Sequence, residues 1–106
     1  MTNAKPHRIK NHTFRGRRYA IKWRRPKNRQ EVGTCDGPNE VHKTIEINPK
    51  LDADDLLRVA IDEGLHACHW DIDNDAIGET SETLKNFLWR IGFRLAPEEN
   101  NSILHK

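Results

Sequence analysis

The sequence predicts an α+β fold, with a small N-terminal antiparallel sheet followed by two packed helices. Residues 18–24 and 41–47 alternate apolar and polar side chains, which is the period of half-buried strands. Two later segments, about 53–69 and 74–91, carry apolar residues at helical spacing. Strands that precede helices in this order are typical of an α+β domain. A chain of 106 residues has room for one such core.

Turn-forming residues separate the two expected strands. In the first strand, Tyr19, Ile21 and Trp23 alternate with mostly basic neighbours. A turn is expected from Pro26, and a loop is expected over residues 34–39, which contain Asp, Gly, Pro and Asn. The second strand should end at residues 48–49, an Asn-Pro pair.

Capping residues mark the ends of both expected helices. Asp52 is suited to cap the first helix, since short acidic side chains accept hydrogen bonds from free N–H groups. Asp73 is expected to cap the second helix, and Gly92 stands where a glycine commonly ends one. The first helix has its apolar positions at Leu57, Ile61, Leu65 and Cys68. The second has them at Ile77, Leu84, Leu88 and Ile91.

A single domain is expected over residues 15–96, between a basic tail at 1–14 and a C-terminal tail at 97–106. The first tail has almost no apolar residues to bury. No apolar run approaches the roughly 20 residues that cross a bilayer, so no membrane contact is expected. The chain also starts without a signal-like apolar segment, and its two cysteines fit a reducing compartment. We therefore expect a cytoplasmic protein with free thiols.

Charge is distributed unevenly along the chain. Residues 1–30 contain eleven Lys and Arg and no acidic residue, whereas residues 31–106 contain seven basic and sixteen acidic residues. A basic arm on an acidic body indicates contact with nucleic acid, contact with an acidic protein, or pairing between the two parts. The residues expected to form a phosphate-binding face are Arg15, Arg17, Arg18, Lys22, Arg24 and Arg25.

The segment with the clearest chemical pattern is Asp62-Glu63-Gly64-Leu65-His66. On a helix, Asp62 and His66 lie one turn apart on one face, where two side chains can hold one metal ion. Glu63 lies beside them and can reach a water on that ion, as the Glu of an H-E-x-x-H helix does. An Asp and a His at this spacing can also be no more than a solvated helical pair. Glu63 is flanked by Ala60, Ala67 and Trp70, which favours a functional role for it, because carboxylates are costly on apolar faces.

A catalytic metal site needs a third protein ligand. Glu79 is the first candidate, near the start of the second helix, and Glu82 is its rival one turn later. Other candidates are less well placed, namely Asp71 and Asp75, and Cys35 and Asp36 in the loop between Gly33 and Gly37. His69 is a candidate auxiliary ligand, although a helix-end His near the negative dipole end is the simpler interpretation.

These residues carry a resemblance to a known family. The strand 44–47 followed by the helix through residues 60–67 resembles the edge strand and active-site helix of small zincin metallopeptidases. Residues 62–71 together with 87–94 are similar to short bacteriophage proteins with a metallopeptidase-like core. The segment 76–79 is similar to the glutamate helix of gluzincins. The resemblance covers about residues 33–95 and leaves the basic arm unexplained.

The resemblance implies a minimal zincin-like domain whose first helix carries the metal site. Glu63 would be the general base, and Asp62, His66 and Glu79 would hold zinc or another divalent transition metal, acting on a peptide or protein substrate. Asp62 departs from the family pattern, because it replaces the first histidine and favours harder metals. The alternative is an inactive scaffold that binds nucleic acid or an acidic host protein through its basic arm. A hydrolase brought to nucleic-acid-bound proteins resembles SprT-like proteases, and a phage-encoded chain would act in the host cytoplasm.

Overall fold

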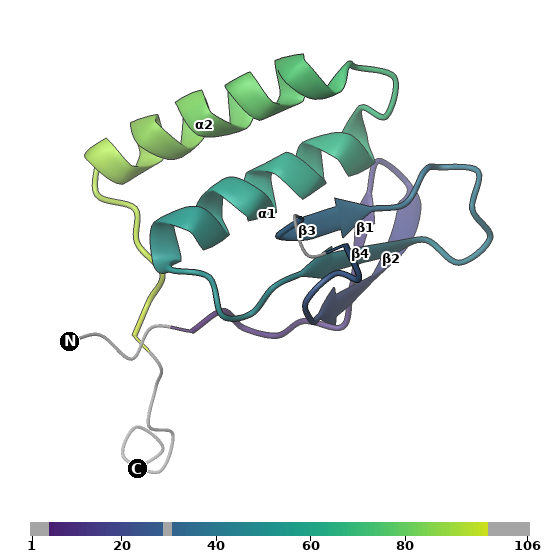
Figure 1. Cartoon of the computed structure of the whole chain (residues 1–106), viewed down its shortest axis with the longest axis horizontal. Coiled ribbons are helices and arrows are strands. Elements are labelled where there is room, and N and C mark those ends of the chain that lie inside the picture. Colours follow the sequence, from purple (N-terminus) through teal and green to yellow (C-terminus); the bar gives the residue numbers. More distant parts are fainter. Residues whose placement is uncertain (1–4, 29–30, 98–106) are drawn as a thin grey trace, which may run out of the picture.

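The computed structural model describes residues 5–28 and 31–97 and has three layers (Figure 1). A four-stranded sheet forms the first layer, helix α1 lies on one face of it, and helix α2 lies on α1. The strands are β1 (Asn11–Phe14), β2 (Arg17–Trp23), β3 (Gly33–Cys35) and β4 (Thr44–Ile47). The helices are α1 (Ala53–Cys68) and α2 (Asn74–Arg90). The predicted α+β order of strands and then helices is confirmed.

The sheet is mixed, with the order β1-β2-β4-β3. Its two outer pairs, β1 with β2 and β3 with β4, are antiparallel, and each contains one strand that was not predicted. The central pair is parallel, with Ile21 opposite Ile45 and Trp23 opposite Ile47. Alternation of side chains is the same in parallel and antiparallel strands, so the sequence pattern does not reveal this direction. In this order, β1 and β3 are the two edge strands of the sheet.

Two strands lie in segments that were expected to be irregular. Strand β1 lies within the predicted tail 1–14, so the ordered domain begins earlier than expected, while residues 1–4 lie outside the described part. Strand β3 begins the predicted loop 34–39. Conversely, β4 starts three residues later than expected, and Val41 is 87% exposed. Strand β1 has three exposed positions out of four, and β3 has only three residues, so neither shows an apolar alternation.

The β1–β2 hairpin is held to the end of α1 by its turn. Arg15 and Gly16 both have positive φ, 49° and 81°, as in the tight turns that suit the twist of a hairpin. The Arg15 guanidinium donates to the carbonyl oxygen of Cys68 at 2.9 Å. It therefore places a cation at the negative end of the α1 dipole.

Both helices end close to their predicted bounds. Asp73 accepts a hydrogen bond from the Ala76 N–H, which confirms its capping role, whereas Asp52 occupies the cap position without such a bond. Gly92 has φ 103°, and its N–H donates to the Trp89 carbonyl while the Phe93 N–H donates to that of Leu88. These two bonds form a Schellman motif at the end of α2. Neither described helix is long and apolar enough to cross a membrane.

The core lies between the sheet and α1. Tyr19, Ile21, Ile45 and Ile47 face Leu56, Val59 and Ala67, and all seven are buried. Helix α2 contacts α1 and, in the described chain, none of the strands. Helix α1 is therefore covered on two sides, and its polar residues between these sides are withdrawn from water.

Gly33 permits the contact between β3 and α1. A Cβ at this position would lie 2.7 Å from Cγ1 of Val59 and 2.9 Å from Oε2 of Glu63. We predict that Gly33→Ala lowers the free energy of unfolding by about 1–3 kcal/mol, because the helix must move outward. Urea denaturation measures this change.

Gly78→Ala is the matched control, since a Cβ at this exposed α2 position meets nothing within 4 Å. Alanine there should raise stability by about 0.5–1 kcal/mol through helix propensity. Equal effects of the two substitutions would contradict the proposed tight contact at Gly33.

Candidate metal and acid–base site

Helix α1 brings the three residues of the sequence motif together. One ligand atom from each of Asp62, Glu63 and His66 lies within 4.8 Å of the other two. The cluster opens on a cavity of about 290 Å³ between α1 and β3. The other residues that line this cavity are Glu31, Gly33, Thr34, Cys35, Trp70 and Asn74. The predicted association of the three residues is therefore seen in the structure, with solvent access from one side.

Glu63 is the most unusual residue of the cluster. Its side chain is 6% exposed and lies against Gly33, where the missing Cβ leaves room for its carboxyl group. Within the described residues, no hydrogen bond or ion pair reaches this carboxyl group. Burial raises the pKa of Glu63 to about 8, and the negative charges of Asp62 and Glu31 act in the same direction. A buried carboxyl without a fixed partner that faces a cavity is typical of a functional site.

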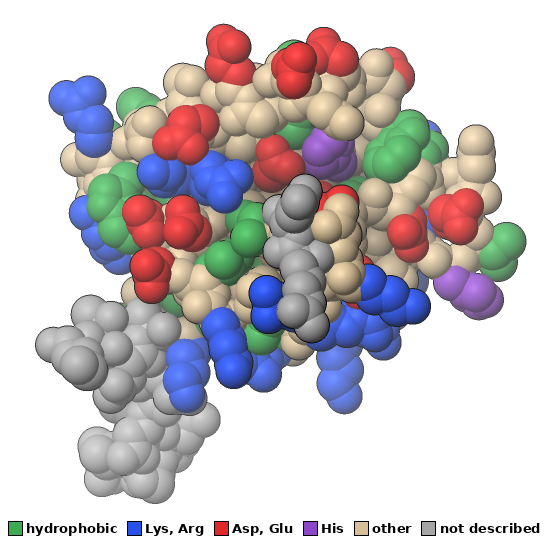
Figure 2. Space-filling view, in the orientation of Figure 1, with side chains coloured by type: hydrophobic (Ala, Val, Ile, Leu, Met, Phe, Trp, Pro, Cys, Tyr) green, Lys and Arg blue, Asp and Glu red, His purple; other side chains and the backbone are tan. Residues whose placement is uncertain are grey.

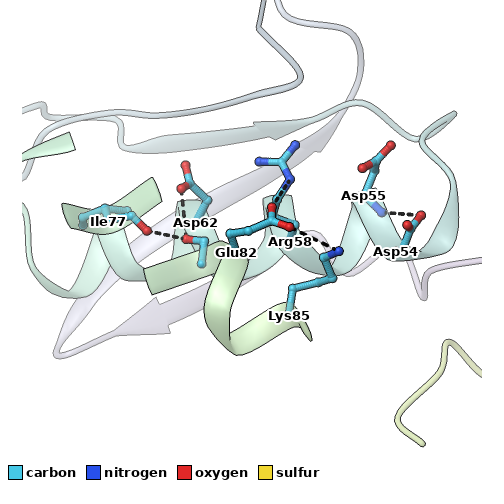
Figure 3. A network of polar contacts seen from close by, with 8 residues as sticks. Asp54, Asp55, Arg58, Asp62, Ile77, Glu82 and Lys85 are labelled. Atoms are coloured by element: carbon cyan, nitrogen blue, oxygen red, sulfur yellow. Dashed lines mark hydrogen bonds and ion pairs between the residues drawn. The ribbon is translucent and has the colours of Figure 1, made fainter. Parts of the chain in front are cut away.

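Asp62 and His66 are oriented by contacts on both sides. His66 Nε2 lies 3.5 Å from Oδ2 of Asp62. Ser81 of α2 is fully buried. Its hydroxyl oxygen lies 3.0 Å from Oδ1 of Asp62 and 2.8 Å from the carbonyl oxygen of Ile77 (Figure 3). The single hydroxyl proton can be donated to either of these oxygens. The imidazole ring is tilted toward Trp70, with 6.3 Å between the ring centroids. Helix α2 thus contributes a positioning hydroxyl, which the sequence analysis did not identify.

The structure does not bring the expected third ligands into the cluster. Glu79 is exposed on α2 and is not among the grouped ligand atoms. Glu82 lies 3.8 Å from Arg58 of α1 and 3.5 Å from Lys85 of its own helix (Figure 3). Asp71 and Asp75 are also exposed and outside the group. Helical spacing places a residue on a face of its own helix, but only the packing angle of α2 decides which residues of α2 meet α1.

Glu31 and Asn74 line the cavity instead, and the sequence carried no signal for either. Glu31 comes from the loop before β3, and Asn74 is the first residue of α2. Neither has a fixed spacing to the motif on α1. Their approach depends on the fold of the loop and on the turn between the helices.

The remaining candidate ligands have other contacts. His69 is exposed, and its Nδ1 lies 3.3 Å from the Arg15 guanidinium. Asp36 accepts a hydrogen bond from the Thr44 N–H at 2.9 Å. Cys35 does line the cavity, but burial raises the pKa of its thiol to about 12, so it is a neutral thiol rather than a thiolate ligand. Both cysteines are free.

The basic residues expected to form one face are divided between different roles. Arg18 and Lys22 lie on the sheet face opposite α1, where alternation along β2 places them. Arg24 forms an ion pair with Glu46 of β4, and Arg15 caps α1. Arg17 and Arg25 are exposed. Figure 2 shows Lys and Arg side chains gathered on the sheet side of the molecule and acidic side chains over the helices.

Comparison with models of protein families, with curated proteins and with solved structures finds no match to this chain. The resemblance to zincin-like proteins therefore stays a prediction. The functional argument rests on the geometry of the cluster and on the chemistry of its side chains.

The raised pKa of Glu63 predicts a pH dependence of stability. Between its ordinary value of 4.5 and about 8, the unfolded chain has released this proton and the folded chain has kept it. The stabilisation is complete below pH 4.5 and is lost as pH rises toward 8, by an amount on the order of a few kcal/mol. Glu63→Gln should abolish this loss in chelator-treated protein, as measured by urea denaturation at several pH values.

The exposed Glu79 provides the matched control, because Glu79→Gln removes a carboxyl group that is in contact with water. Its stability should follow the wild-type curve across the same pH range. If the curve of Glu63→Gln also ran parallel to the wild type, the burial of an uncharged Glu63 would be refuted.

Proposed function

We propose that this protein binds one divalent metal ion through Asp62 and His66 and hydrolyses peptide bonds with Glu63 as the acid–base group. The observation that carries the proposal is the buried Glu63 carboxyl group, which has no fixed partner among the described residues and faces a cavity beside Asp62 and His66. An ordinary helical ion pair would not require a third, buried acid beside it.

The donor set fits a divalent cation. It offers a carboxylate from Asp62 and an imidazole nitrogen from His66, and the carboxyl group of Glu63 lies within 4.8 Å of both, close enough to act on a water bound to the same ion. Oxygen-rich sets of this kind accept zinc and also harder metals such as manganese or iron. The hydroxyl of Ser81 supports the fit, because hydrogen bonds to ligating carboxylates fix their orientation. The lining residue Glu31 could complete the set.

Glu63 is suited to proton transfer in this setting. A bound divalent ion polarises a carbonyl group and lowers the pKa of water. A pKa of about 8 lets the Glu63 carboxyl group change protonation state close to neutral pH, and a nearby cation would favour its charged form. Glu63 would take a proton from the attacking water and return it to the leaving amine of the substrate.

The edge strand β3 favours a peptide as substrate. The Asn48 N–H donates to the Val32 carbonyl, and the Asp36 N–H donates to that of Thr44. Because backbone groups alternate along an antiparallel pair, those of Gly33 and Cys35 turn toward the open edge. An extended peptide could add to this edge by main-chain hydrogen bonds, beside the cavity that Gly33 lines.

Metal content tests the first part of the proposal. Purified protein incubated with zinc, manganese or iron should retain about one equivalent of ion, and His66→Ala and Asp62→Ala should lose it. Elemental analysis after desalting measures the stoichiometry.

Two further variants serve as controls for the metal measurement. His69→Ala and Glu79→Gln should retain the ion, because both side chains lie outside the cluster. Loss of metal in Glu79→Gln would instead identify Glu79 as the third ligand. No retention of any of the three metals by the wild type would refute the site.

Hydrolysis of a labelled unstructured protein tests the second part. Glu63→Gln should reduce the rate at least about 100-fold, since general acid–base groups contribute roughly that much, while metal content stays unchanged. Activity that survives in Glu63→Gln would exclude Glu63 as the acid–base group.

A further inference from the structure

A second cavity lies away from Glu63 and is lined almost entirely by cationic and small residues. Its volume is about 560 Å³, and it lies between the β1–β2 hairpin and the loop that leads into β4. Lys10, Arg17 and Arg18 contribute from one side, and His42 and Lys43 contribute from the other. No acidic residue lines it. We call this cavity the basic cleft.

Backbone hydrogen bonds fix both walls of the basic cleft to β2. The Ala20 N–H donates to the carbonyl of Lys43, and the next N–H, that of Ile21, donates to the carbonyl of Lys10, each at 2.9 Å. Lys10 and Lys43 are therefore anchored on opposite sides of β2, and Arg18 lies on β2 between them. The cleft is a consequence of the sheet order, because β1 and β4 both pair with β2.

The cations of the cleft differ from many others in the molecule. Arg15 is bonded to the end of α1, Arg24 pairs with Glu46, and Arg94 lies 3.6 Å above the ring of Trp89. Lys10, Arg17, Arg18 and Lys43, by contrast, form no ion pair within the described chain. Like charges that line one cleft repel each other, so an anionic ligand would relieve a real electrostatic cost.

We propose that the basic cleft binds the phosphodiester backbone of a nucleic acid. Four Lys and Arg residues line this cleft, and its size suits several phosphate groups rather than one. The lining contains no Phe, Tyr or Trp on which bases could stack, so its contacts would be to phosphates, which carry no sequence information. The proposed binding site therefore includes Lys10, His42 and Lys43, which the sequence analysis did not name. It excludes Arg15 and Arg24, whose side chains make contacts within the protein.

Fluorescence anisotropy with labelled oligonucleotides of about 6 and 20 nucleotides tests the proposal. The longer strand should bind more tightly, with an affinity that falls steeply with salt. The double variant Arg18→Ala/Lys43→Ala should bind at least about tenfold more weakly at low salt. Its salt slope should also be smaller by about 1.5, which corresponds to two lost phosphate contacts.

The control is Lys50→Ala/Arg90→Ala, which removes the same charge from exposed residues outside the cleft. It should bind within about twofold of the wild type, and Arg18→Lys/Lys43→Arg should also retain binding. Circular dichroism checks that each variant is folded. If Arg18→Ala/Lys43→Ala and Lys50→Ala/Arg90→Ala weakened binding equally, net charge alone would cause the binding. That result would overturn the proposal that the basic cleft is the binding site.

Two further outcomes would overturn the nucleic-acid assignment. One is an absence of oligonucleotide binding at low salt. The other is competition by inorganic pyrophosphate as strong, mole for mole, as that of the long strand, which would indicate a site for small phosphates. Every one of these experiments measures oligonucleotide binding, and each is repeated with the Glu63→Gln protein. The results therefore do not depend on the metal site or on hydrolysis.

Discussion

The close approach of α1 to Gly33 of β3 determines most of what this protein can do. With no side chain at Gly33, Val59 and Glu63 lie directly against the strand, and the Glu63 carboxyl group loses most of its contact with water. Helix α2 covers α1 from the other side and brings Ser81 to Asp62. The three-residue cluster is therefore held by the sheet and by α2 together. Its unusual electrostatics follow from packing rather than from the motif alone.

The second organising feature is the separation of charge between layers. Residues 5–28, which include β1 and β2, carry ten basic and no acidic residues, whereas residues 52–90 carry ten acidic and three basic residues. Because the sheet and the helices form different layers, the charge separation along the sequence becomes a separation in space (Figures 1 and 2). The acidic layer favours a cation, and the sheet layer favours a polyanion. A third cavity shares Trp70 with the cavity at Glu63 and Arg17 with the basic cleft.

Much of the fold could be predicted from local patterns, and the failures have physical causes. Both helices and strands β2 and β4 were found because apolar periodicity and capping residues are local properties. Strands β1 and β3 were missed because β1 is mostly exposed and β3 has only three residues, so neither shows an apolar period. The cluster of Asp62, Glu63 and His66 was predictable, since one helical turn defines it. Ser81, Glu31 and Asn74 were not, because they approach the cluster from other elements.

The sequence by itself determined both helices, strands β2 and β4, the i, i+4 pair on α1, and the separation of basic from acidic segments. Only the tertiary structure decided that β2 and β4 run parallel, that Glu63 is buried, and that Glu79 and Glu82 lie away from the cluster. It also decided that Lys10 and Lys43 line one cleft with Arg18. The physical reason is that periodicity and charge order are properties of neighbouring residues. Burial, pKa and the meeting of distant side chains depend instead on how the layers pack.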